Sequence, residues 1–279
     1  MTSHDVVSRA RRQLGTRRVG HAGTLDPMAT GVLVLGVDRA TRLLGHLALH
    51  DKSYDATIRL GASTVTDDVE GDVLTVASAA ARQAISDHQV QAALHAMTGT
   101  IRQRPSSVSA IKVAGRRAYD RVQAGEEVEL PEREVEITEI LLSKISRDAD
   151  GIDVHVSVTC STGTYIRAIA RDLGQALQVG GHLTSLRRTR VGPFQIQESV
   201  GIDDIAAGVR SMDVVAPRCF PVVVLDHGQA DNARHGRPQI WPGSPAPGTY
   251  ALVDVAGRLL ALGQPDGSKV KYLAVFATD

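Results

Sequence analysis

The 279-residue chain has few aromatic residues, two cysteines and no long apolar run. Its 3 Phe, 1 Trp and 5 Tyr are too few for a surface that stacks several bases of a nucleic acid. Cys160 and Cys219 form no CxxC pair, so a disulfide framework and a cysteine-based zinc site are excluded, and a cytoplasmic location is expected. The longest uncharged apolar stretch, residues 31–37, is far too short to span a membrane.

Three common cofactor and metal motifs are also missing from the sequence. It contains no Walker phosphate loop, no GxGxxG and no HExxH, so a nucleotide cofactor and a zinc-protease centre have no support. No second histidine lies at ligand spacing from His21. We therefore expect no metal.

The formal net charge is zero, which by itself argues against a polyanionic partner. The basic residues are clustered, however, and a local cluster attracts a polyanion even when the total is zero. Each cluster is either a solvated face or a contact for phosphate, and the presence of three clusters favours phosphate. The balancing acids lie in residues 67–72 and 126–136. The clusters are Arg9, Arg11, Arg12, Arg17 and Arg18; Arg102, Arg104, Lys112, Arg116, Arg117 and Arg121; and Arg187, Arg188 and Arg190.

Apolar spacing and capping residues predict a mixture of helices and strands. Alternation over residues 53–60 turns Tyr54 inward on a half-buried strand. The same pattern over residues 152–160 makes Cys160 a core residue rather than a reactive thiol. The other expected elements are a helix after Thr2, a buried strand at 32–37, helices at 40–49 and 87–97, long functional loops at 98–125, a helix from Thr164, and a β-rich tail from 220 with a hairpin at 250–263.

The loop that ends in Thr24-Leu25-Asp26-Pro27 carries the most concentrated signal for chemistry. Pro27 biases Asp26 towards an extended conformation, and the neighbouring glycines allow a ligand or another chain to come close. Asp26 is therefore either a functional carboxylate on a stiff loop or the first residue of an ordinary Asp-Pro turn.

Arg167 falls in the first turn of its predicted helix, where a cation opposes the helix dipole by about 0.3–1 kcal/mol. A carboxylate partner or a bound phosphate would hold it there, and a solvated arginine is the alternative. Tyr165 either packs beneath Arg167 or fills the core. His21 is either a functional residue or a loop residue that forms hydrogen bonds.

Longer motifs follow one another along the chain: TSHDVV, GHAGTLDPMATGVLVLGVDRATR, KSYDATIRLG, SAIK with AGRRAYDRVQAGE, CSTGTYIRAIARDLG and HLTSLRRTRVGPF. In this order they closely resemble the bacterial TruB family, the tRNA pseudouridine-55 synthases, from residue 2 to about residue 200. The tail resembles the PUA-like domain that ends these enzymes. The resemblance implies an α+β pseudouridine synthase fold, with a mixed or antiparallel central sheet flanked by helices and loops. It also implies a catalytic domain over residues 1–215 and a small β-rich RNA-binding domain over residues 216–279.

The resemblance also assigns roles to seven residues. Asp26 becomes the catalytic carboxylate, Arg167 its partner, and Tyr54 the ring that stacks on a flipped uracil. The other four resemble residues that bind the substrate: Tyr165 packs beside Arg167, Leu186 forms an apolar wall of the uracil pocket, His21 occupies the stack that flipped bases vacate, and Lys112 belongs to a loop that clamps the tRNA.

The reaction that the resemblance implies breaks the C1′–N1 bond of a uridine, rotates the uracil, and joins its C5 to C1′. The base must first leave its stack. No cofactor and no metal are expected. The expected partner is the T arm of tRNA, the protein is expected to be a monomer, and no membrane partner is expected. Two alternatives remain: a non-catalytic protein that binds or folds tRNA, and an RNA-directed glycosidase that releases free uracil.

The start of the chain departs from the family pattern. Family members normally have an additional strand and a Lys-Pro-x-Gly turn before the first helix, whereas here Met1 stands immediately before that helix. We expect the true start to lie upstream. Without the extra strand, a sheet edge or a core face would be uncovered, and folding and activity would both suffer.

Overall fold

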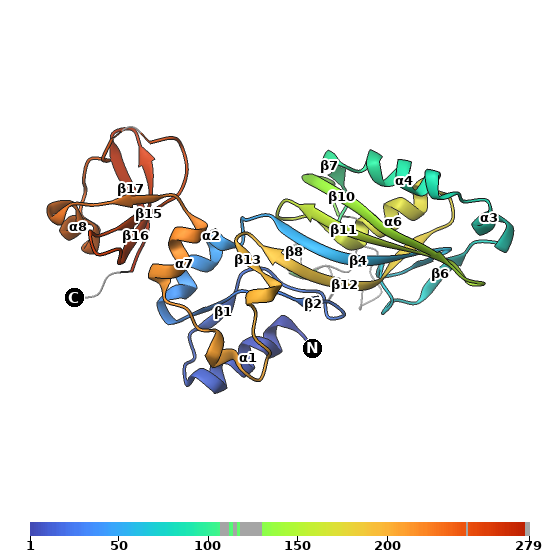
Figure 1. Ribbon diagram of the computed structural model, residues 1–279, viewed down its shortest axis with the longest axis horizontal. Coiled ribbons are helices and arrows are strands. Elements are labelled where there is room, and N and C mark those ends of the chain that lie inside the picture. The colour runs from blue at the N-terminus through green and yellow to red at the C-terminus, as the bar shows by residue number, and fades with distance from the viewer. Residues whose placement is uncertain (107–111, 114–115, 118–129, 244, 277–279) are drawn as a thin grey trace. The chain divides into compact units, whose positions relative to one another are not determined.

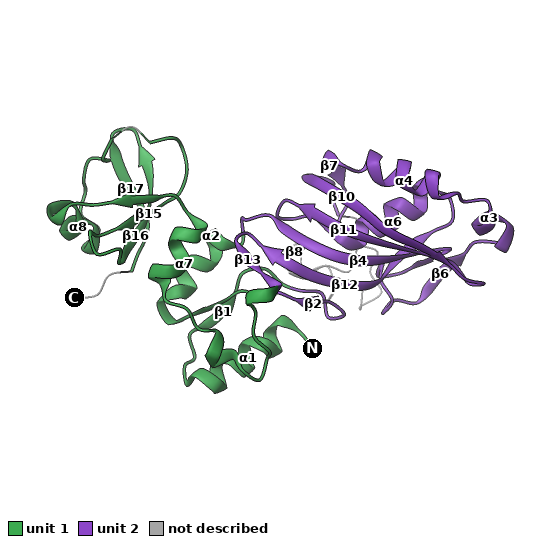
Figure 2. Cartoon of the chain, in the orientation of Figure 1, with its two compact units in different colours: residues 1–24, 33–48, 197–279 green, residues 25–32, 49–196 purple. Residues whose placement is uncertain are grey.

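The computed structural model describes residues 1–106, 112–113, 116–117, 130–243 and 245–276. The chain divides into two compact units, which are described separately (Figure 2). The first unit comprises residues 1–24, 33–48 and 197–279, and the second comprises residues 25–32 and 49–196. The short segment 25–32 is therefore built into the same unit as the long stretch that follows residue 49.

A mixed sheet forms the centre of the second unit (Figure 1). In the described residues its strand order is β13-β12-β4-β11-β10-β7, with β2 beside β12. Neighbouring strands are antiparallel, except that β2 runs parallel to β12. The α+β fold class with a mixed central sheet is thus confirmed. The strands are β2 (Thr30–Gly31), β4 (Lys52–Leu60), β7 (Gly99–Gln103), β10 (Arg133–Arg147), β11 (Ile152–Cys160), β12 (Gly181–Val191) and β13 (Phe194–Gln195).

The two central strands confirm the predicted alternation. In β4 every second residue, from Tyr54 to Leu60, is buried, and Tyr54 is 8% exposed. In β11 the buried residues run from Ile152 to Cys160 in the same way. A strand that covers a core on one face requires this period of two.

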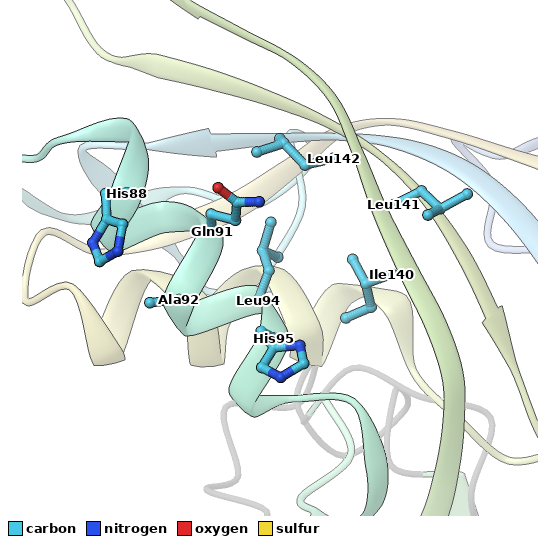
Figure 3. A pocket seen from close by; sticks show the side chains of 8 residues that line it. All are labelled: His88, Gln91, Ala92, Leu94, His95, Ile140, Leu141 and Leu142. Carbon is cyan, nitrogen blue, oxygen red and sulfur yellow. The ribbon is translucent and has the colours of Figure 1, made fainter.

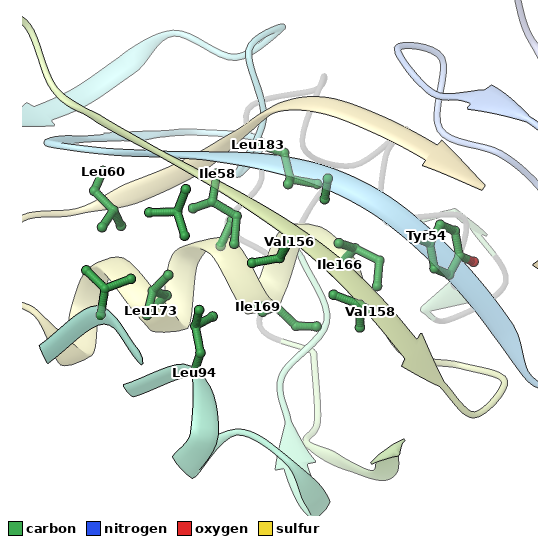
Figure 4. Close-up of a cluster of buried hydrophobic side chains, with 14 of the residues drawn as sticks. Tyr54, Ile58, Leu60, Leu94, Val156, Val158, Ile166, Ile169, Leu173 and Leu183 are labelled. Carbon is green, nitrogen blue, oxygen red and sulfur yellow. The ribbon is translucent and has the colours of Figure 1, made fainter. Parts of the chain in front are cut away.

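Helices pack on the buried face of the sheet, with apolar side chains between the two layers (Figure 4). Ile166, Ile169 and Leu173 of α6 (Ile166–Ala176) contribute to this core, as the predicted apolar stripe requires. Helix α6 approaches β12 so closely that a Cβ on Gly174 would lie 2.1 Å from the Gly181 nitrogen, which only glycine permits. The remaining elements of the unit are β5 (Ala62–Thr64), β6 (Val73–Val76), α3 (Ala79–Gln83), α4 (Asp87–Ala96), β8 (Lys112–Val113) and β9 (Arg116–Arg117).

The first unit begins with the predicted capped helix. In α1 (Ser3–Leu14) Thr2 and Asp5 form a capping box. The predicted hairpin in the tail is also present, with Tyr250 opposite Gly263. None of the described helices is long and apolar enough to cross a membrane. The other elements are β1 (Val19–His21), β3 (Leu35–Val37), η1 (Asp38–Leu43), α2 (Leu44–Leu47), η2 (Ile196–Glu198), η3 (Ile205–Gly208), α7 (Met212–Cys219), β14 (Val222–Val224), α8 (His227–Arg234), β15 (Tyr250–Val253), β16 (Leu259–Asp266) and β17 (Lys269–Val275).

Three predicted elements are wrong in detail. Residues 32–37 do not form one buried strand, because the chain changes units after Val32 and only Leu35–Val37 pairs, with β1. Residues 40–49 form a 3₁₀ helix and a single α-turn, where Gly45 lowers the helix propensity. Within the predicted loops at 98–125, Gly99–Gln103 is strand β7 on the edge of the sheet. Ile101 is its one large apolar residue, so alternation gave no signal.

Candidate active site

Asp26 and Arg167, which are 141 residues apart in sequence, form a two-pronged ion pair in the second unit. Arg167 Nε donates to Asp26 Oδ2 and Arg167 Nη2 donates to Asp26 Oδ1, both at 3.1 Å. The Arg167 side chain is 5% exposed, whereas the Asp26 side chain is 32% exposed. The arginine is thus part of the interior, and the carboxylate opens to the surface.

Backbone contacts fix the loop that carries Asp26. The Ala29 N–H donates to the Asp26 carbonyl at 2.9 Å, which closes a turn with Pro27 at its second position. Thr30 and Gly31 then pair with β12. Gly31 has φ +101°, and a Cβ there would lie 2.1 Å from the Arg188 carbonyl oxygen. Asp26 therefore begins an Asp-Pro turn and also pairs with Arg167, while its function as a carboxylate stays a prediction.

A second carboxylate, which the sequence analysis did not single out, also binds Arg167. Arg167 Nη1 lies 3.3 Å from Asp68 Oδ2 and donates to the Thr66 carbonyl at 3.0 Å. Asp68 is almost fully buried and in turn accepts from the Thr66 hydroxyl and from the Glu70 N–H. The predicted carboxylate partner of the first-turn arginine is therefore present, and there are two of them. Asp68 stands in the acidic stretch 67–72, and such a stretch in a sequence is typical of an exposed loop. Nothing in the sequence therefore indicated that Asp68 is buried.

Tyr54 lies on β4 with its side chain in the core. Burial raises the pKa of its hydroxyl to about 12, although the positive charge of Arg188 opposes the shift. Arg188 is itself 1% exposed and donates through Nε to the Val32 carbonyl at 2.8 Å. The phenol is therefore uncharged at neutral pH, and its polar neighbour is the buried Arg188.

Tyr165 and Leu186 also lie in the second unit. Tyr165 precedes α6, and its backbone N–H and carbonyl bind the side-chain amide of the buried Gln103 at 2.8 and 3.1 Å. The guanidinium of Arg133 stacks over the Tyr165 ring, 5.6 Å from its centre. Leu186 is 5% exposed on β12, opposite Ala56.

The two remaining site residues lie elsewhere. His21 ends β1 in the first unit, and Lys112 begins β8, where only the backbone is described. The structure thus brings Asp26, Arg167, Tyr54, Tyr165 and Leu186 into one unit. The catalytic and binding roles of all seven residues remain predictions.

The structure changes the interpretation of the basic clusters. Arg188 is buried, and Arg190 is held by both oxygens of Asp51 at 3.1 and 2.6 Å, so two of the three arginines in the last cluster are structural. The prediction of a phosphate contact is wrong for Arg188, because its side chain is buried like that of Leu186 two residues earlier on the strand, whereas for Arg190 it stays a prediction. In the first cluster Arg9 pairs with Asp203 at 2.9 Å. Arg121 lies outside the described residues.

Two further features lie apart from the ion pair. Burial raises the pKa of the Cys160 thiol to about 11, as expected of an unreactive core cysteine. A groove of about 480 Å³ lies between α4 and β10 and is lined by His88, Gln91, Ala92, Leu94, His95, Ile140, Leu141 and Leu142 (Figure 3). None of the seven predicted site residues lines this groove.

Comparison with known proteins places this chain among the pseudouridylate synthases, a class of isomerase. Residues 11–166 match the TruB family pseudouridylate synthase N-terminal domain, residues 167–215 match the tRNA pseudouridylate synthase B C-terminal domain, and residues 220–277 match the tRNA pseudouridine synthase II C-terminal domain. The chain belongs to the TruB family.

Relatives of similar length share about half of the residues. A tRNA pseudouridine synthase B of Cutibacterium acnes is 54% identical over 273 residues, which are 96% of this chain and 91% of the relative. The enzyme of the same name from Thermobifida fusca is 51% identical, over 99% of this chain and 94% of its own. The one from Mycobacterium ulcerans is 50% identical, over 99% of this chain and 91% of its own.

Solved structures show the same fold at lower identity. An H/ACA RNP bound to a substrate RNA containing 2′-deoxyuridine matches with a TM-score of 0.72 and 24% identity, over all of this chain and 82% of the other. A Cbf5-Nop10-Gar1 complex matches with a TM-score of 0.74 and 24% identity, over 99% of this chain and 82% of the other. These likenesses concern the fold alone.

Proposed function

We propose that this protein is a tRNA pseudouridine synthase that isomerises the uridine at position 55, in the TΨC loop. The ion pair between Asp26 and Arg167 carries the proposal, since it places an accessible carboxylate on a buried arginine in a chain of this family. The relatives named tRNA pseudouridine synthase B support tRNA as the substrate.

Asp26 acts in this proposal as the catalytic carboxylate. Each carboxylate oxygen has two acceptor sites, and Arg167 occupies one on each oxygen. Within the part of the chain that the structure describes, the other sites and the exposed third of the side chain are left for the substrate. A two-pronged arginine also fixes the plane of the carboxylate, so that a reacting atom meets it in one orientation.

Tyr54 and Leu186 form the base pocket in this proposal, and Tyr165 packs beside Arg167. Removing a uracil from the RNA stack costs a few kcal/mol of free energy, and stacking it on one aromatic ring contributes about 1–3 kcal/mol in the opposite direction. The Tyr54 ring is fixed before the base arrives, because the core and Arg188 hold it. His21 takes the place of the flipped bases, and Lys112 binds the tRNA.

We assign residues 1–215 to the catalytic domain and residues 216–279 to RNA binding. The domain match over residues 220–277 and the four-stranded sheet β14-β15-β16-β17 support this division. The protein acts as a cytoplasmic monomer on the T arm of tRNA.

The experiment measures pseudouridine in an unmodified tRNA transcript after incubation with wild type, Asp26→Asn and, as a matched control, Asp150→Asn. Asp150 is an exposed carboxylate between β10 and β11, so its amide should leave the rate unchanged. Asp26→Asn should bind tRNA and form no product. A wild type that binds tRNA without product supports the non-catalytic alternative, release of free uracil supports the glycosidase, and full activity of Asp26→Asn refutes the role of Asp26.

A further inference from the structure

One turn after Arg167, helix α6 carries a second arginine in the same arrangement. Residues four apart lie on one helix face, so Arg171 stands beside Arg167. Arg171 Nη2 donates to the Arg104 carbonyl at 2.8 Å, Nε donates to Asp172 Oδ1 at 2.9 Å, and Nη1 lies 3.4 Å from Asp67 Oδ2. The side chain is 19% exposed and has three acceptors.

The two arginines bind consecutive aspartates of one loop. Arg167 binds Asp68 and Arg171 binds Asp67. Asp67 has φ +58°, a left-handed conformation that only a few per cent of non-glycine residues adopt. This conformation sends neighbouring side chains to the two arginines, and it persists only where surrounding contacts enforce it.

Other contacts tie the backbone of this loop to the sheet. The Leu183 N–H of β12 donates to the Asp67 carbonyl at 3.0 Å, and the Thr64 hydroxyl donates to the Asp68 carbonyl at 2.8 Å. These bonds place the backbone of the loop, and the ion pair with Arg171 holds the Asp67 side chain. Burial raises the pKa of Asp67 and of Asp172, while the charge of Arg171 opposes the shift at both groups. Without Arg171, the nearly buried Asp67 and the partly exposed Asp172 would each lose a compensating positive charge.

We propose that Arg171 is a positioning residue for pseudouridine formation: it holds Asp67 and so the loop turn that sets Asp68 against Arg167, and through Arg167 it orients Asp26. The inference rests on the proposed function. Arg171 does not contact Asp26 in the described structure, so its effect passes through the loop and Arg167. Its contact with the Arg104 carbonyl also ties the loop to the stretch of chain just after β7.

The test compares single-turnover rate constants at saturating enzyme for wild type, Arg171→Gln, Arg171→Lys and Asp67→Asn, with tRNA binding measured separately. Arg171→Gln should reduce the rate constant about 10- to 100-fold, as expected when a displaced group misaligns the chemistry, with unchanged tRNA affinity. The rate constant of Arg171→Lys should lie between those of wild type and Arg171→Gln, because lysine keeps the positive charge but cannot bind three acceptors as the guanidinium does. Asp67→Asn tolerates the left-handed conformation and should reduce the rate in the same direction. In the double variant that combines Arg171→Gln with Asp67→Asn, the two reductions of the rate constant should not add.

The matched control is Arg147→Gln. Arg147 likewise binds an aspartate, Asp87, and a backbone carbonyl, that of Ile85 at 3.1 Å, and it contacts none of the site residues. It should keep the wild-type rate constant. A lower melting temperature with an unchanged rate constant for Arg171→Gln would refute the inference, as would additive effects in the double variant. Wild type without product would instead refute the proposed function, which the wild-type arm shows directly.

Discussion

Asp68→Asn tests whether Arg167 needs both of its carboxylates. At 3.3 Å the attraction between Arg167 and Asp68 is about 5 kcal/mol at an effective dielectric constant of 20. The net loss is smaller, about 1–3 kcal/mol, because Arg167 keeps Asp26 and the Thr66 carbonyl. An asparagine of the same shape also cannot satisfy the site. If its oxygen faces the Glu70 N–H, its amide group faces Arg167, and either orientation sets two donors against each other.

The assay is single-turnover pseudouridine formation with saturating enzyme, beside tRNA binding and urea unfolding. We expect about a 10- to 100-fold lower rate constant, since a tilted guanidinium moves Asp26 out of alignment. The tRNA affinity should not change, because the Asp68 side chain is 4% exposed. Asp148→Asn is the control, since Asp148 also binds an arginine and two backbone N–H groups, at the hairpin beside Arg59. A wild-type rate constant for Asp68→Asn would show that Asp26 alone orients Arg167.

Two further predictions concern RNA binding and the thiols. Replacing Arg12, Arg17 and Arg18, all exposed, by glutamine should lower tRNA affinity and reduce the slope of log K against log salt by about 1 for each phosphate that is no longer neutralised. Arg190→Gln should leave that slope unchanged, because Asp51 holds Arg190, and equal slopes in both variants would contradict the assignment. Cys160 should react with a thiol reagent only after unfolding, since burial raises its pKa to about 11, and rapid labelling of the folded protein would contradict this.

The sequence predicted those parts of the fold in which one face is apolar and the other polar. The strand from Lys52 to Leu60 and the one from Ile152 to Cys160 alternate along their whole length, so their inward faces were visible. Capping residues marked the start of α1 at Thr2. The edge strand β7 escaped detection because a strand with one large apolar residue has no visible period.

The sequence predicted Asp26 and Arg167 but not what surrounds them. Their pairing joins residues 141 apart, and the neighbouring residues of Arg167 suggested only that some partner exists. Asp68 stands in an acidic stretch that resembles a solvated loop, and nothing local shows that α6 covers it. Arg188 looked available for phosphate because a count of nearby charges ignores the alternation of strand faces.

The net charge of zero does not mean that basic and acidic residues are simply segregated in the structure. In the described part of the second unit, several arginines are paired with carboxylates: Arg59 with Asp148 and Asp153, Arg167 with Asp26 and Asp68, and Arg171 with Asp67 and Asp172. An arginine matched in this way adds little to the field that attracts RNA. It instead fixes loops, and at α6 it fixes the loops that carry the chemistry. The steering of tRNA then falls to exposed cations such as Arg12, Arg17 and Arg18, so affinity and catalysis should respond to different arginines.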